Sequence, residues 1–291
     1  MAPVVCHGGL LSVFTGLVLA LGTAGAGAQL PPSRHVKASL LAETDAVRPG
    51  QALTVGIRLE MEKGWHTYWR NPGDAGLPTR VKWDLPQGWT AGAIRWPYPM
   101  RFRTGPILSY GYEHEVLLLV EIQPPMAVSA REVRVAGRVD WLECQDACLP
   151  GKAEVALTLP VRAGAAPGPH AALFAEARRR LPEKDPGWRF SASPAGQGLS
   201  LVMRPPRELA LLEAYFYSAT PRLVDYASPQ ELQREGSAHR LTLARDPSGA
   251  PSGRLAGVLV AETGHGTVAV EVDAPIVSGP ARSSMKKERR P

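Results

Sequence analysis

Cysteine is scarce in this sequence, with three cysteines among 291 residues. Cys144 and Cys148 lie four positions apart, and Cys6 lies in an N-terminal segment that we expect to be removed. The mature chain would therefore have one cysteine pair and no further thiol. In an oxidising compartment such a pair is either a small structural disulfide or a site of thiol–disulfide exchange.

Long apolar runs are also missing after residue 29. The longest run there covers residues 116–120, whereas crossing a bilayer takes about 20 residues. Before residue 29, residues 10–21 are almost wholly apolar, and residues 26–28 read Ala-Gly-Ala, a small-residue cleavage site. The sequence therefore predicts a signal peptide at residues 1–28, although His7 is the only basic residue before the apolar stretch. We expect an exported, soluble protein.

The sequence lacks the motifs of several classes of enzyme and nucleotide-binding protein. There is no phosphate-binding loop, dinucleotide fingerprint or serine elbow, and we expect no cofactor. Four of the six net positive charges lie in the last ten residues, so the charge predicts a disordered basic tail at residues 277–291 and not a nucleic-acid-binding surface.

What the sequence does contain is strand periodicity with turn residues. Leu53, Val55, Ile57, Leu59 and Met61 alternate with polar or small residues, which is typical of a half-buried strand. Similar alternation occurs at residues 133–141 and 155–161, and a denser apolar run lies at residues 115–122. Proline and glycine turns separate these segments, which favours an antiparallel sandwich.

A second half follows an Ala/Gly/Pro-rich stretch. Residues 163–169 read as a linker, and Leu173, Ala177 and Leu181 follow at helical spacing before Pro182. Further strands are expected at residues 199–203, 209–217, 240–244, 254–262 and 267–272. The predicted organisation is an all-β chain of two sandwich domains, at residues 29–162 and 186–276, joined by a linker and short helix at residues 163–185.

The cysteine pair falls in the connection between two of the predicted strands. Residues four apart in an extended chain are about 13 Å apart, whereas a disulfide needs Cα atoms within about 4.4–6.8 Å, so this connection must curl. Closing so small a ring is worth roughly 2 kcal/mol, which modestly favours a redox role over a structural one.

A metal site is a further interpretation of the cysteine pair that stays open at this point. The thiolates of the pair could join His66 or His114 in a zinc or copper(I) site, although no second ligand pair has a recognisable spacing. Glu143 and Asp146 flank the cysteines and disfavour a very acidic thiol. The aromatic segment at residues 64–70 is interpreted as a core strand.

Several motifs in order carry a resemblance to a known family. They are GWHTYWRNPGDAGLPT at residues 64–79, WPYP at 96–99, YGYE at 110–113, WLEC at 141–144 and CLPG at 148–151. With these motifs, residues 35–162 resemble the amino-terminal domain of the DsbD disulfide reductases, and in particular the suppressor-of-copper-sensitivity protein B branch.

The resemblance implies an immunoglobulin-like periplasmic domain that is followed, in this branch, by a second sandwich. It implies that Cys144 and Cys148 are the redox pair, with no metal, taking electrons from a transmembrane protein and reducing thioredoxin-like periplasmic clients. Family members carry that transmembrane domain themselves, so a separately encoded partner is expected here, and membrane contact only through it. A cap loop would match residues 98–105, with Phe102 as a candidate cap residue.

The sequence therefore predicts a periplasmic component of a protein-disulfide reductase. The alternative is a non-catalytic binding or copper-handling module in which the disulfide only holds a hairpin together.

Overall fold

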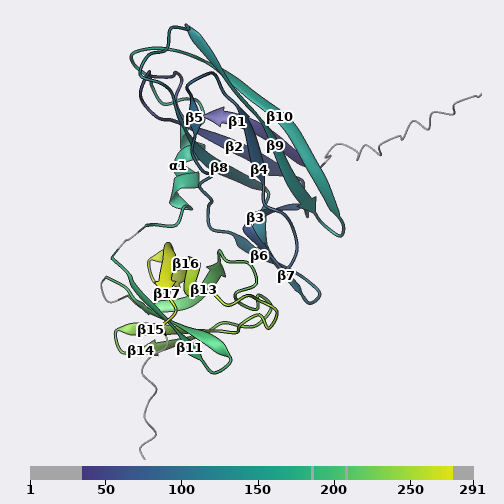
Figure 1. Cartoon of the computed structure of the whole chain (residues 1–291), viewed down its shortest axis with the longest axis vertical. Coiled ribbons are helices and arrows are strands. Elements are labelled where there is room, and N and C mark those ends of the chain that lie inside the picture. The colour runs from purple at the N-terminus through teal and green to yellow at the C-terminus, as the bar shows by residue number, and fades with distance from the viewer. Residues whose placement is uncertain (1–34, 185–186, 207–208, 278–291) are drawn as a thin grey trace, which may run out of the picture. The chain divides into compact units, whose positions relative to one another are not determined.

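The computed structural model describes residues 35–184, 187–206 and 209–277 (Figure 1). The predicted signal peptide, Cys6 and the predicted basic tail beyond Val277 lie outside these residues. Within the described part of the chain, no helix is long and apolar enough to cross a membrane.

Residues 36–160 form two antiparallel sheets. One has the strand order β1–β2–β8–β5, and the other has the order β10–β9–β3–β7–β6 with β4 paired to β9. Their strands are β1 (Val36–Ala42), β2 (Leu53–Met61), β3 (His66–Gly73), β4 (Arg80–Asp84), β5 (Thr90–Ala91), β6 (Met100–Thr104), β7 (Ile107–Glu113), β8 (Glu115–Gln123), β9 (Glu132–Cys144) and β10 (Cys148–Pro160).

The alternation in β2 produces the core between these sheets. Each of its five alternating apolar residues is buried, and they belong to one hydrophobic cluster with apolar residues of both sheets. The denser run in β8 has a different cause, because β8 is buried on both faces. Its Leu117 and Leu119 pack against Phe174 and Ala177 of the helix α1 (Ala171–Arg179), which lies beside β8 in Figure 1.

The end of the stretch predicted as a linker is hydrogen-bonded to the first half. The backbone N–H of Gly168 donates to the carbonyl of Glu43, and the N–H of Ala166 donates to the side chain of Asp45. From α1, Arg178 forms an ion pair with Glu43. Residues 166–168 of the predicted linker are therefore attached to the first sandwich.

Residues 189–275 form a second pair of antiparallel sheets, with strand orders β11–β12–β15–β14 and β13–β16–β17. The strands are β11 (Arg189–Ala195), β12 (Gly198–Arg204), β13 (Leu211–Ser218), β14 (Glu231–Glu235), β15 (Ala238–Leu243), β16 (Arg254–Thr263) and β17 (Gly266–Pro275). The predicted fold class is thus confirmed: the described residues form two immunoglobulin-like antiparallel β-sandwiches with one short helix.

Polar and aromatic contacts join the two halves, whose described residues belong to one compact unit. The buried side chain of Asn71 donates through Nδ2 to the carbonyl of Ser218 at 2.7 Å and to the hydroxyl of Tyr226 at 3.1 Å. The hydroxyls of Tyr110 and Tyr215 are hydrogen-bonded at 2.9 Å.

Candidate functional site

The cysteine pair lies at the end of the β9–β10 hairpin. Cys144 is the last residue of β9, Cys148 is the first of β10, and the two are paired in register. They form a disulfide with their Cα atoms 4.2 Å apart. The curled connection predicted from the spacing is therefore present, with residues 145–147 forming the turn.

The two sulfur-bearing residues differ in exposure. Cys144 is 2% exposed, whereas Cys148 is an exposed residue. A thiolate that attacks a disulfide must reach one sulfur in line with the bond. Access therefore favours attack on the sulfur of Cys148, and Cys144 would be the leaving group.

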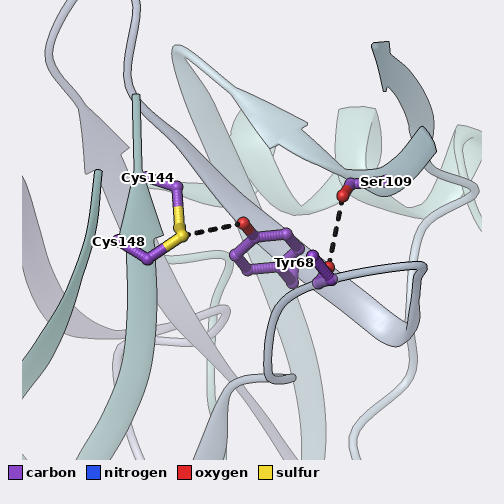
Figure 2. Close-up of a disulfide and its surroundings, with 5 residues drawn as sticks. Tyr68, Ser109, Cys144 and Cys148 are labelled. Atoms are coloured by element: carbon purple, nitrogen blue, oxygen red, sulfur yellow. Dashed lines mark hydrogen bonds between the residues drawn. A yellow bond between two sulfur atoms is a disulfide. The ribbon is translucent and has the colours of Figure 1, made fainter. Parts of the chain in front are cut away.

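Tyr68 of β3 contacts the exposed member of the pair. Its hydroxyl lies 3.5 Å from Sγ of Cys148 and points toward the disulfide in Figure 2. A disulfide sulfur carries no hydrogen, so the hydroxyl is the donor. Burial raises the pKa of Tyr68 to about 12, which keeps this hydroxyl protonated at neutral pH. In the reduced protein the same hydroxyl can donate to a thiolate and stabilise it.

The segment that follows β3 holds the Tyr68 ring in place. Gly76 has a φ of +115°, and a Cβ there would lie 2.3 Å from ring carbons of Tyr68. Asp74 accepts a hydrogen bond from the N–H of Leu108 at 2.8 Å, and the hydroxyl of Ser109 donates to the carbonyl of Ala75. Figure 2 shows the hydrogen bond of Ser109 to this segment. The glycine allows close approach, and the hydrogen bonds to β7 fix the segment.

His66 lies between the cysteine pair and the hairpin of β6 and β7, which carries the candidate cap residue Phe102 and is therefore called the cap hairpin. It is the register partner of Cys144 across β3 and β9. Its ring meets Tyr68 edge-on at 5.2 Å between centroids and stacks on Phe102 at 4.6 Å. Burial lowers the pKa of His66, so its imidazole is neutral at pH 7.

The structure places Phe102, the candidate cap residue, on β6 and in contact with the site through His66. The predicted cap stretch at residues 98–105 includes the whole of β6. His114, the other histidine considered as a metal ligand, lies in the tight β7–β8 turn with its side chain 74% exposed. Among the described residues, no group of three or more His, Cys, Asp or Glu side chains is arranged to hold a metal ion.

Of the two acids that flank the pair, only Asp146 is exposed to solvent. Glu143 is fully buried and accepts a hydrogen bond from Nε1 of Trp141 at 2.9 Å. Across the hairpin, a Cβ on Gly151 would lie 2.2 Å from the Trp141 ring. The Trp-Leu-Glu-Cys and Cys-Leu-Pro-Gly motifs are thus packed against each other just beside the disulfide.

The sequence reasoning named the cysteines and Phe102 as candidate site residues but assigned no role to Tyr68. Tyr68 and His66 were interpreted as part of a core strand, and Tyr68 is indeed buried. The available signal was their spacing of two, which places both side chains on one face of a strand, within the aromatic motif at residues 64–79.

Comparisons with known proteins agree with this geometry. A family model described as "Thiol:disulfide interchange protein DsbD, N-terminal" matches residues 37–160. The solved structure of the N-terminal periplasmic domain of ScsB from Proteus mirabilis is 20% identical, with a TM-score of 0.62, and the match covers 86% of this chain and 97% of that one. At this identity the likeness shows a shared fold.

A protein of unknown function from Porphyromonas gingivalis W83 also matches, at 10% identity and a TM-score of 0.26, over 84% of this chain and 100% of that one. This likeness is too low to carry an argument. A search of curated proteins by sequence gave no match.

Proposed function

Residues 37–160 belong to the family of DsbD N-terminal domains, and from this premise we propose that the chain is a periplasmic relay for thiol–disulfide exchange. Its Cys144–Cys148 pair would accept electrons from a membrane-embedded reductase and pass them to thioredoxin-like client proteins. The observation that carries the proposal is the asymmetry of the pair: Cys148 is exposed and contacted by the Tyr68 hydroxyl, while Cys144 is buried.

The exchange can be written with these two roles. A thiolate of the donor attacks Sγ of Cys148, the Cys144–Cys148 bond breaks, and Cys144 leaves as a thiolate. The second thiolate of the donor then attacks its own sulfur in the mixed disulfide and releases Cys148. The donor is oxidised to a disulfide, and this chain holds two thiols after two electrons and two protons have been transferred.

Delivery to a client uses the same residues. The Cys148 thiolate attacks a client disulfide and forms a mixed disulfide, and one client sulfur leaves. Cys144 then attacks Sγ of Cys148, which restores the disulfide and releases the client as a dithiol. The Tyr68 hydroxyl would stabilise negative charge on the Cys148 sulfur each time that sulfur attacks or leaves.

A trapping experiment tests this assignment. In C144A the exposed Cys148 has no resolving partner, so exported protein should accumulate mixed disulfides that disappear with reductant on gels. C148A leaves only the buried Cys144 and should accumulate far fewer. Adducts from C148A alone would reverse the roles, and no adduct from either folded variant would contradict the relay.

The alternative, a module whose disulfide is only structural, is less well supported by the hairpin. All 13 residues of β9 pair with the 13 residues of β10, so the hairpin is held by a long ladder without the sulfur bond. The reduction potential separates the two functions. A structural disulfide should have a potential below about −300 mV and a relay a higher one, as measured by equilibration in dithiol buffers.

A further inference from the structure

The two faces of strand β6 contact different parts of the protein. Successive side chains of a strand point to opposite faces, so Phe102 points one way and its neighbours Arg101 and Arg103 the other. Phe102 stacks on His66, beside the cysteine pair. Arg101 and Arg103 contact the second half of the chain.

These arginine contacts involve both charge and geometry. The guanidinium of Arg101 lies over the ring of Tyr215, with Cζ 4.3 Å from the ring centroid, which is a cation–π contact. Nη2 of Arg103 donates to the carbonyl of Ala227 at 3.1 Å. The outer face of β6 is therefore attached to β13 and to the loop that follows it.

Strand β7 adds a buried anchor at the same place. Tyr110 is the register partner of Arg101, is fully buried and shares a hydrogen bond with the hydroxyl of Tyr215 at 2.9 Å. Tyr215 thus holds both strands of the cap hairpin, through the guanidinium on β6 and the phenol on β7.

Beyond these contacts the turn of the cap hairpin and the outer side of β6 border open space. Its turn includes Gly105, where an added Cβ would meet nothing within 4 Å. An open cavity of about 670 Å³, whose lining includes Arg101, Arg103 and Tyr215, borders it on the side of the second half. Besides its pairing with β7 and the stack of Phe102 on His66, β6 is held at this end through the contacts of Arg101 with Tyr215 and of Arg103 with Ala227.

We propose that the second sandwich sets the position of the cap: Arg101 and Arg103, held by Tyr215 and Ala227, are positioning residues that keep Phe102 over His66 and limit access to Cys148. That this cap affects exchange with client proteins rests on the proposed relay function. A partner that displaces Phe102 must bend β6 against these contacts, so the second half regulates how readily the disulfide is reached.

The test measures how fast dithiothreitol reduces the disulfide of the full mature chain, followed by thiol labelling. The R101A/R103A double variant should be reduced about 5- to 70-fold faster, the range expected for losing a cation–π contact and a hydrogen bond together. The disulfide of F102A should be reduced faster than that of the wild type to a similar degree. R95A is a matched control, because Arg95 is a half-exposed arginine with only a 3.8 Å ion pair to Glu121, and it should be reduced at the wild-type rate.

A double-mutant cycle separates positioning from general loosening. If the arginines act through Phe102, the R101A/R103A/F102A variant should be reduced no faster than F102A alone. If the two arginine substitutions accelerated reduction equally in the wild type and in F102A, the proposal would be overturned. A wild-type reduction rate in R101A/R103A, together with a faster rate in F102A, would also overturn it. A wild-type rate in F102A itself would show that Phe102 is no cap. Because the reductant is a small dithiol, these outcomes do not depend on whether the chain exchanges thiols with a protein client.

Discussion

The hydroxyl of Tyr68 contacts Sγ of Cys148 across 80 positions of sequence. The contact arises because β3 meets β9 at a single register position, where His66 faces Cys144, and Tyr68 lies two residues further along the same face of β3. A buried phenol thus reaches the exposed sulfur of the pair. We expect this single hydrogen bond to have a measurable effect on the pKa of the Cys148 thiol.

Replacing Tyr68 by phenylalanine should raise the pKa of the Cys148 thiol. The hydroxyl can donate to the thiolate but gains little from the thiol, so its loss disfavours the charged form. A hydrogen bond worth about 0.5–1.5 kcal/mol corresponds to a rise of roughly 0.4–1 pKa unit. The rate of iodoacetamide alkylation of the reduced protein against pH measures this pKa.

The control for this variant is Y112F. Tyr112 is also buried, and its hydroxyl donates to the carbonyl of Pro97 at 2.7 Å, so Y112F should lower stability without moving the alkylation profile. An unchanged profile in Y68F would mean that the hydroxyl does not contact the thiolate in the reduced state.

Replacing Gly76 by alanine should destabilise the protein and displace Tyr68. The residue has a positive φ, and the added methyl would overlap the Tyr68 ring. We expect a loss of about 1–3 kcal/mol in the free energy of unfolding, together with an alkylation profile shifted in the direction of Y68F. G196A also places alanine at positive φ, but in open space. G196A should lower the free energy of unfolding by less than G76A and leave the alkylation profile of the thiol unchanged. If both variants changed stability and alkylation equally, close packing of residue 76 on Tyr68 would be refuted.

The pattern of the sequence predicted those strands that have one apolar face. The segment predicted at residues 53–61 is β2 to the residue, because burial on one face imposes alternation. Strand β6 was not predicted, since it is exposed along most of its length and has Phe102 as its one half-buried residue. Its place depends on pairing with β7, which a local pattern does not encode.

The composition of residues 163–169 predicts a linker but not how that linker is attached, for a related reason. The hydrogen bonds of Gly168 and Ala166 to Glu43 and Asp45 are made over more than 120 positions of sequence, which a local pattern does not encode. Likewise, the spacing of Cys144 and Cys148 was enough to locate the site, whereas the role of Tyr68 depends on which strands are neighbours. The domain boundaries at residues 162 and 186 remain predictions.

Stability should fall as the pH drops below about 6.5, and His66 should account for part of the loss. Burial lowers the pKa of His66 in the folded protein from 6.5, and the pKa of His239 is lowered for the same reason. Below pH 6.5 the unfolded chain therefore binds protons that the folded protein does not, and this favours unfolding. Above pH 6.5 both states are neutral at these positions and the effect is absent.

Urea unfolding between pH 5 and 7.5 checks this prediction. H66Q should show a shallower decline of unfolding free energy with falling pH. His239 and, near pH 5, carboxyl groups with a lowered pKa such as Glu43 account for the remaining decline. A slope in H66Q equal to that of the wild type would show that His66 titrates alike in the folded and unfolded chains.

Reduction of the disulfide should leave the protein folded. The Cys144–Cys148 ring closes few residues, so its loss should cost at most roughly 2 kcal/mol, and the ladder between β9 and β10 remains. The far-ultraviolet circular dichroism spectrum should be unchanged, and the melting temperature should fall by about 4–8 °C per kcal/mol lost if the first sandwich melts as a unit. The C144A/C148A variant, treated with the same reductant, controls for effects of the reagent. A relay must present the same surface to its partners in both redox states, so unfolding of residues 36–160 on reduction at ambient temperature would identify the pair as a structural disulfide and exclude the relay.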